Sequence, residues 1–254
     1  MKVKLIAHTP EPEKLVAAAA KLCYSPATID TILDGLTEEK TEAFLGRLAS
    51  YGHMTPIEHA SFTFAIEGVS RSLLAQITRH RLASFSVQSQ RYVKENNFSF
   101  VTPPEIAADP VAAEMFQKNM QNSWNDYLAL ADRLQEKHMA DMLAAGMDEK
   151  RARSAAEKKA IEDARYVLPN ACETKMIFTM NVRSLHNFFN LRCCNRAQWE
   201  IRDLAWDMLR QCREVCPMLF RNAGPACLRG ACPEGGMTCG MANQIRERSE
   251  QLGK

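Results

Sequence analysis

The residues best suited to bind an anion are concentrated between Arg79 and Arg91, in the stretch RHRLASFSVQSQR. This stretch holds three arginines, one histidine and three serines within thirteen residues. Guanidinium groups and hydroxyls are the donors that proteins use to bind phosphate oxygens. Because the whole chain carries a formal net charge of only +2, the cationic cluster is local. Such a cluster favours a small anionic ligand over a long polyanion.

The composition limits the classes of partner. The chain has 254 residues, of which 46% are hydrophobic and 24% charged, as in ordinary folded proteins. A protein that follows a nucleic-acid backbone would carry a larger, segregated basic excess, so we expect no nucleic-acid partner. No stretch approaches the ~18 uncharged apolar residues of a membrane span, and the N-terminal segment lacks an apolar signal core. We therefore expect no membrane association and a cytoplasmic location.

The nine cysteines fall into two groups. In a reducing compartment we expect most to be free thiols. Five lie among apolar or helical residues and are expected to be buried: Cys23, Cys172, Cys193, Cys194 and Cys212. The other four are Cys216, Cys227, Cys232 and Cys239, in or beside a Gly- and Pro-rich tail. Four thiols could form a structural zinc site, but their spacing is not that of a zinc ribbon. A reduced tail without metal is the favoured interpretation.

Hydrophobic periodicity predicts the elements that position these residues. Strands are expected at 2–8, 61–66 and 173–182, and helices at 13–23, 38–52, 71–77, 111–145 and 147–167, with Gly146 as a break. Ser70 and Ser184 are expected to start helices, and Pro103, Pro104 and Pro110 to mark a loop. A last amphipathic helix spans 197–220, kinked or ended by Pro217. This pattern predicts an α+β fold with a small, mostly antiparallel sheet and several long helices, organised as one domain over 1–221 and a tail over 222–254.

Further polar segments accompany the cluster: HMTPIEH at 53–59, RYVLP at 165–169 and NVRSLHNFFNLR at 181–192. On a helix, Arg183 and Asn187 share a face, with Leu191 expected in the core. Arg192 lies nine residues beyond Arg183, roughly 900° at ~100° per residue, which predicts the opposite side of the helix. Two different ligands, or a ligand and a neighbouring subunit, could then contact one helix.

Each segment also has a purely structural interpretation. The arginines could be solvated or paired with glutamates, the histidines could be structural, and Ser84, Ser86 and Ser89 could be polar positions of an edge strand. The chain has no G-x-S-x-G, G-x-G-x-x-G or Walker motif, which argues against a serine nucleophile, a Rossmann turn and a P-loop.

The segments together resemble one family. The pattern RHRxxSxxxxSxR at 79–91 matches the signature of the flavin-dependent thymidylate synthases. HMTPIEH is similar to that family's H-x-[ST]-P-x-E-H segment, and RYVLP, NVRSLHNFFNLR and AQWEIR resemble its later blocks in the same order. The resemblance covers roughly residues 1–221. It implies a homotetramer with shared sites that makes dTMP from dUMP, with methylenetetrahydrofolate as carbon donor and NADPH as reductant through FAD.

The resemblance also implies roles for individual residues. The residues implied for dUMP are Gln76, Arg79, Val87, Gln88, Ser89, Gln90, Arg91, Arg165 and Arg192. The residues implied for FAD are His53, Thr55, Arg79, His80, Arg81, Asn181, Arg183 and Asn187. Arg192 is the expected catalytic residue, because a cation beside the uracil can stabilise a deprotonated ring without an enzyme nucleophile. No metal is expected. The alternative is a non-enzymatic nucleotide- or RNA-binding module that uses the same basic cluster.

Overall fold

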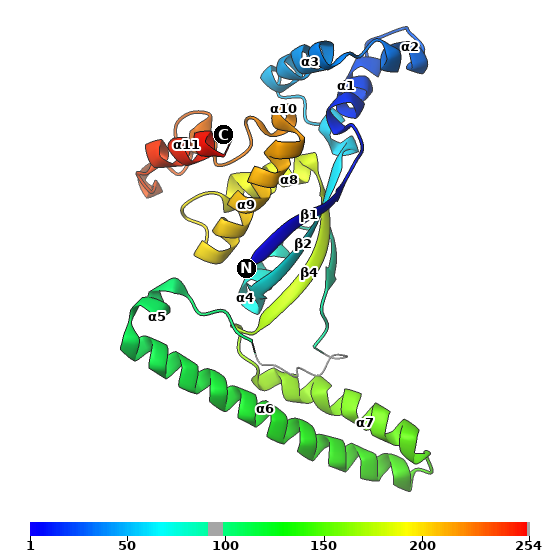
Figure 1. The fold of residues 1–254 in the computed structure, drawn as a ribbon, viewed down its shortest axis with the longest axis vertical. Coiled ribbons are helices and arrows are strands. Elements are labelled where there is room, and N and C mark those ends of the chain that lie inside the picture. Colours follow the sequence, from blue (N-terminus) through cyan, green and yellow to red (C-terminus); the bar gives the residue numbers. More distant parts are fainter. Residues whose placement is uncertain (91–98, 253–254) are drawn as a thin grey trace. The chain divides into compact units, whose positions relative to one another are not determined.

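The computed structural model describes residues 1–90 and 99–252, and within them it contains eleven α-helices and four strands (Figure 1). The strands are β1 (Lys2–His8), β2 (Ser61–Ser70), β3 (Ser84–Val87) and β4 (Glu173–Asn181). The helices are α1 (Pro12–Leu22), α2 (Ile29–Asp34), α3 (Glu38–Ser50), α4 (Arg71–Ile77), α5 (Pro104–Ala108), α6 (Pro110–Ala144), α7 (Glu149–Ala164), α8 (Val182–Arg192), α9 (Trp199–Val215), α10 (Pro217–Phe220) and α11 (Ala242–Gln251). The sheet is antiparallel with the order β1-β2-β4-β3, which confirms the predicted α+β fold.

The contacts divide the chain into two compact units. The first comprises Met1–Ile66, Ala75–Ser86 and Met176–Lys254, and the second comprises Glu67–Leu74 and Val87–Lys175. None of the described helices combines the length and the apolar character needed to cross a membrane.

The core of the first unit is built on the alternating strands predicted from the sequence. Phe62 and Phe64 of β2 and Phe178 of β4 are buried, and the rings of Phe64 and Phe178 stack with centroids 5.8 Å apart. Phe62 also meets Phe220 of α10 edge-on at 5.3 Å. Alternation works here because successive side chains of a strand point to opposite faces.

Helices α8 and α9 carry the apolar faces expected of them. Phe188 and Phe189 are buried, whereas Leu191, which we expected in the core, is 49% exposed. The buried indole of Trp206 donates to the carbonyl of Cys193 at 3.1 Å, which fixes the turn after α8. Pro217 follows α9 as the first residue of α10, where its missing N–H costs nothing.

In the second unit, α6 and α7 form the predicted helical pair, which Figure 1 shows as two long helices side by side. Gly146 takes φ +83° between them, the conformation that favours glycine. Tyr127 and Ala131 of α6 pack with Ile161 and Ala164 of α7. The expected proline loop is partly wrong, because Pro104 and Pro110 begin α5 and α6, where proline's fixed φ suits the first turn.

The tail and the cysteines differ in part from expectation. The tail contains α11, which its polar composition did not reveal. All nine cysteines are free. Cys172, Cys193 and Cys212 are buried as predicted, but Cys23 is exposed and Cys194 is half-buried. Cys23 is exposed because it lies just past the end of α1.

Candidate active site

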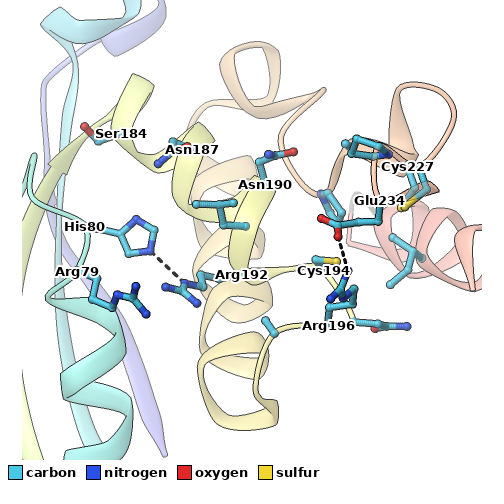
Figure 2. Close-up of a pocket in the computed structure, with 18 of the residues that line it drawn as sticks. Arg79, His80, Ser184, Asn187, Asn190, Arg192, Cys194, Arg196, Cys227 and Glu234 are labelled. Carbon is cyan, nitrogen blue, oxygen red and sulfur yellow. Dashed lines mark hydrogen bonds and ion pairs between the residues drawn. The ribbon is translucent and has the colours of Figure 1, made fainter. Parts of the chain in front are cut away.

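A large cavity in the first unit contains most of the predicted flavin-binding residues. Its volume is about 1140 Å³, slightly above the ~300–1,000 Å³ typical of ligand sites. The predicted residues that line it are Arg79, His80, Arg81, Asn181, Arg183, Asn187 and Arg192. They come from two segments about a hundred residues apart, and Figure 2 shows Arg79, His80 and Arg192 directed toward one another from facing segments.

The turn after α4 presents the first of these segments. The Ser70 hydroxyl caps this helix by accepting from the Leu73 N–H at 3.0 Å, as predicted. At the other end, the Arg79 N–H donates to the Gln76 carbonyl at 3.4 Å and the His80 N–H donates to the Ile77 carbonyl at 3.1 Å. The chain then leaves the helix, so the side chains of the signature follow its C-terminal end, where cations are favoured.

His80 is held in its neutral form. Burial, and then the charges of Arg192 and Arg79, lower its pKa from 6.5 to about 4. Arg192 Nε donates to His80 Nε2 at 3.1 Å, which requires the proton of the neutral ring to be on Nδ1. The ring of Phe188 meets His80 edge-on, with centroids 5.0 Å apart. His80 is therefore an acceptor that orients the Arg192 guanidinium.

Helix α8 presents the second segment. Its N-cap is Asn181, whose side chain accepts from the Ser184 N–H at 2.8 Å, so the helix starts earlier than the predicted Ser184. Arg183 and Asn187 line the cavity one turn apart, as their spacing predicted. Arg192 lines the same cavity, although we expected the opposite side of the helix. It does so because its long side chain, on the last residue of α8, reaches His80.

Glu58 is a cavity residue to which sequence reasoning gave no role. Its carboxylate pairs with the Arg183 guanidinium, with side chains 41% and 52% exposed. A pair this exposed contributes only ~0–1 kcal/mol, so an incoming anion can displace it. The HMTPIEH block contains this glutamate, but the sequence does not reveal its partner 125 residues away.

A second cavity of about 480 Å³ adjoins α8 and contains His53. Arg183 and Asn187 line both cavities, so His53 lies near two of the predicted flavin-binding residues. Apolar residues of α3, such as Leu45 and Leu48, form another wall. Thr55 is exposed and immediately precedes the 3-10 helix η1 (Pro56–His59).

Of the described residues predicted to bind dUMP, only Arg79 and Arg192 line the large cavity. Gln76 contributes its carbonyl, which accepts from Arg192 Nη2 at 3.5 Å. Val87, Gln88, Ser89, Gln90 and Arg165 belong to the second unit. There, Gln90 accepts from Arg71 at 2.9 Å, and Arg165 Nε donates to the Glu162 carbonyl at 3.0 Å. Arg91 lies outside the described residues.

Two of the three serines between Arg79 and Arg91 are polar positions of an edge strand, as their structural interpretation proposed. β3 is an edge strand of the sheet, and Ser84 and Ser86 are exposed on it. Phe85 between them faces inward and stacks on Phe178 at 5.6 Å.

The tail supplies a wall of the large cavity that sequence reasoning missed. Arg196, just after α8, pairs with Glu234 of the tail, and Figure 2 shows this pair across from the His80–Arg192 pair. Thiols of the tail line the same cavity: Cys227, Cys232 and Cys239. Burial raises the pKa of Cys227, and the nearby thiols of Cys194, Cys232 and Cys239 raise that pKa further.

Comparison with known proteins places the chain in one family. The family model described as thymidylate synthase complementing protein matches residues 4–218. A protein of Clostridium tetani named flavin-dependent thymidylate synthase is 55% identical over 97% of this chain and 96% of its own length. Proteins with the same name from Geobacter sulfurreducens (48% identical, 99% of each chain) and Nitratidesulfovibrio vulgaris (46% identical, 94% of each chain) are also similar. The chain therefore belongs to the flavin-dependent thymidylate synthase family.

Proposed function

We propose that the chain converts dUMP to dTMP at the large cavity, with FAD as cofactor, methylenetetrahydrofolate as carbon donor and NADPH as reductant. The observation that carries this proposal is the convergence of Arg79, His80, Arg81, Arg183 and Arg192 on one cavity. The family relationship favours this enzyme over the alternative of a nucleotide- or RNA-binding module.

The residues of the cavity fit a large anionic ligand. Its described lining contains five arginines against two glutamates, Glu58 and Glu234. His80 adds no charge near pH 7, because its pKa lies near 4. This cationic excess suits the diphosphate of FAD or the phosphate of dUMP. We therefore assign FAD to His53, Thr55, Arg79, His80, Arg81, Asn181, Arg183 and Asn187.

We assign dUMP to Gln76, Arg79, Val87, Gln88, Ser89, Gln90, Arg91, Arg165 and Arg192. Arg192 is the proposed catalytic residue. His80 Nε2 and the Gln76 carbonyl occupy two of its five N–H donors, and the rest can face the uracil.

Arg192 is suited to stabilise negative charge on the uracil ring. Burial and the charge of Arg79 lower its pKa, yet a guanidinium stays charged at neutral pH. A cation held by His80 needs little reorganisation when charge develops on the ring, so electron density at C5 rises without a covalent enzyme adduct. The flavin, when bound, supplies the hydride that completes the methyl group.

The assembly and its context are part of the proposal. We infer a homotetramer in which neighbouring chains complete the dUMP site, as the resemblance to the family implies. Residues 1–221 would form the catalytic domain, with 222–254 as an added tail. A cytoplasmic location remains our prediction.

Two measurements test the proposal. Purified protein should show a flavin spectrum and should oxidise NADPH faster when dUMP is present. Colourless protein that stays inactive after FAD is added would refute the assignment. Tight, salt-sensitive binding of RNA by flavin-free protein would instead support the alternative module.

Variants test the residue roles. Arg192→Ala should retain bound FAD but lose ~10²–10³-fold in dTMP formation, the effect of removing one donor to developing charge. Arg91→Ala should chiefly weaken dUMP binding, because a phosphate contact acts equally in ground and transition states. Arg133→Ala, which removes an exposed arginine of α6 paired with Glu136, is the matched control and should leave turnover unchanged. Normal turnover by Arg192→Ala would show that its role is wrong.

A further inference from the structure

Within the first unit, arginines that donate to backbone carbonyls hold the tail beyond α10. Arg213 Nη1 of α9 donates to the Ser249 carbonyl at 2.7 Å, and Arg229 Nη1 donates to the Asn222 carbonyl at 2.7 Å. Arg246 Nε of α11 donates to the Cys227 carbonyl at 3.2 Å. The turn that follows α8 contacts the tail through the Arg196–Glu234 pair and through Asn195, whose Nδ2 donates to Met241 Sδ at 3.2 Å.

Four thiols line one cavity in this region. Cys194 belongs to the turn after α8, whereas Cys227, Cys232 and Cys239 belong to the tail, and all four line the large cavity. Figure 2 shows Cys194 and Cys227 on facing segments, beside the Arg196–Glu234 pair. The other three thiols are close enough to Cys227 to act on its charge.

This set differs by one residue from the four thiols grouped by the sequence analysis, which were Cys216, Cys227, Cys232 and Cys239. Cys216 is fully buried ahead of α10, where burial and then the charge of Glu13 of α1 raise the pKa of its thiol. Cys194, far from the tail in sequence, takes its place. A set of four soft donors from two segments, partly open to a cavity, has the composition of a closed Cys₄ site for a thiophilic cation.

We propose that Cys194, Cys227, Cys232 and Cys239 bind a soft divalent cation such as Zn²⁺, which links the tail to the turn after α8. Among the described residues, no three potential ligands already stand in a ligand geometry. Binding therefore requires the tail to close around the ion.

The segment between the thiols can make that movement. Gly235 and Gly240 have φ of +53° and +73°, and Gly230, Gly235, Gly236 and Gly240 have no atom within 4 Å of a position that a Cβ would take. Short glycine-rich turns between ligands allow such a closure at low steric cost. Four thiolates would leave no open coordination position, so the ion would stabilise structure and take no part in the methylation chemistry.

Metal analysis tests the proposal on the flavin-loaded protein. Protein treated with Zn²⁺ under reducing conditions and then desalted should retain about one ion per chain, measured by inductively coupled plasma mass spectrometry. Titration with Co²⁺ should produce a thiolate-to-cobalt charge-transfer band. Cys227→Ser and Cys239→Ser should each weaken Co²⁺ binding at least ~100-fold, beyond the ~10–100-fold typical of outer-shell changes.

Cys23→Ser is the matched control, because Cys23 is exposed, lies just past the end of α1 and is not among the thiols that line the cavity. It should bind both metals like the original chain. Retention of flavin by each variant shows that it has folded. The proposal is overturned if the original chain retains no more metal than Cys227→Ser, or if native mass spectrometry shows a disulfide among these thiols in place of an ion under the same reducing conditions. Metal content is measured independently of turnover. An inactive protein that binds zinc would therefore refute the proposed activity but support the metal site.

Discussion

The neutral state of His80 gives a quantitative prediction. Its pKa of about 4, instead of 6.5, arises first from burial and then from the charges of Arg192 and Arg79. Replacing Arg192 by glutamine removes the nearer charge while keeping an N–H donor at that position. We expect the pKa of His80 to rise in Arg192→Gln, yet to stay below 6.5 because burial, the larger cause, remains.

The shift also predicts how stability depends on pH. Between pH 4 and 6.5 the unfolded chain binds a proton on this histidine and the folded chain does not, so the free energy of unfolding rises with pH across this range. The full shift corresponds to at most ~3.4 kcal/mol. Since the ring is only half-buried, solvent screening reduces this to ~1–2 kcal/mol. The contribution is complete above pH 6.5 and is lost as the pH falls toward 4.

The measurement is an NMR titration of the imidazole Cε1 proton in flavin-free protein. The chain has six histidines, so the His80 signal is assigned by its absence from the spectrum of His80→Gln. Direct titration is preferable to denaturation alone, because burial also raises the pKa of the Glu13 carboxyl, so that other groups add to the pH dependence of stability. A His80 pKa at or above 6.5 in the original chain, or one that does not change in Arg192→Gln, would refute the proposed pairing.

Three further substitutions test how the fold supports the site. Thr37→Ala removes the hydroxyl that accepts from the Lys40 N–H at the start of α3 and should lower the free energy of unfolding by ~1 kcal/mol in urea denaturation. Gly224→Ala places a Cβ 2.5 Å from Leu228 Cδ1 at φ +130° and should cost ~1–3 kcal/mol in the same assay. Arg213→Met leaves the Ser249 carbonyl without its donor and should ease opening of α11 by ~1–3 kcal/mol, seen as faster limited proteolysis of the tail.

Matched variants separate these causes from general damage. Thr37→Ser keeps the hydroxyl and should retain most of the stability. Gly46→Ala lies inside α3 with no atom within 4 Å of the new Cβ, so it should stabilise the chain by ~0.5–1 kcal/mol. Arg210→Met removes an arginine whose partners, Asp207 and Glu214, lie within α9, and should leave the tail intact. Equal losses in a variant and its control would contradict the mechanism given for that pair.

The sequence by itself determined the family, the order of most elements and the side chains of the signature. Local rules were sufficient for these features. The alternation of Phe62 and Phe64 predicted a strand, Ser70 predicted a helix start, and Gly146 predicted the break between α6 and α7. Each depends on residues only a few positions apart, where backbone geometry dictates the pattern.

Only the tertiary structure decided the charge states and partners in the site. His80 is neutral because burial, and then the charge of Arg192 112 positions away, lower its pKa. Arg183 pairs with Glu58, and Cys194, not Cys216, joins the tail thiols. Periodicity along one helix placed Arg192 opposite Arg183, yet both line one cavity. Periodicity describes the direction of a Cβ, whereas the reach of a long side chain depends on its partners. Burial and pairing across long sequence separations are properties of packing, and no local pattern records them.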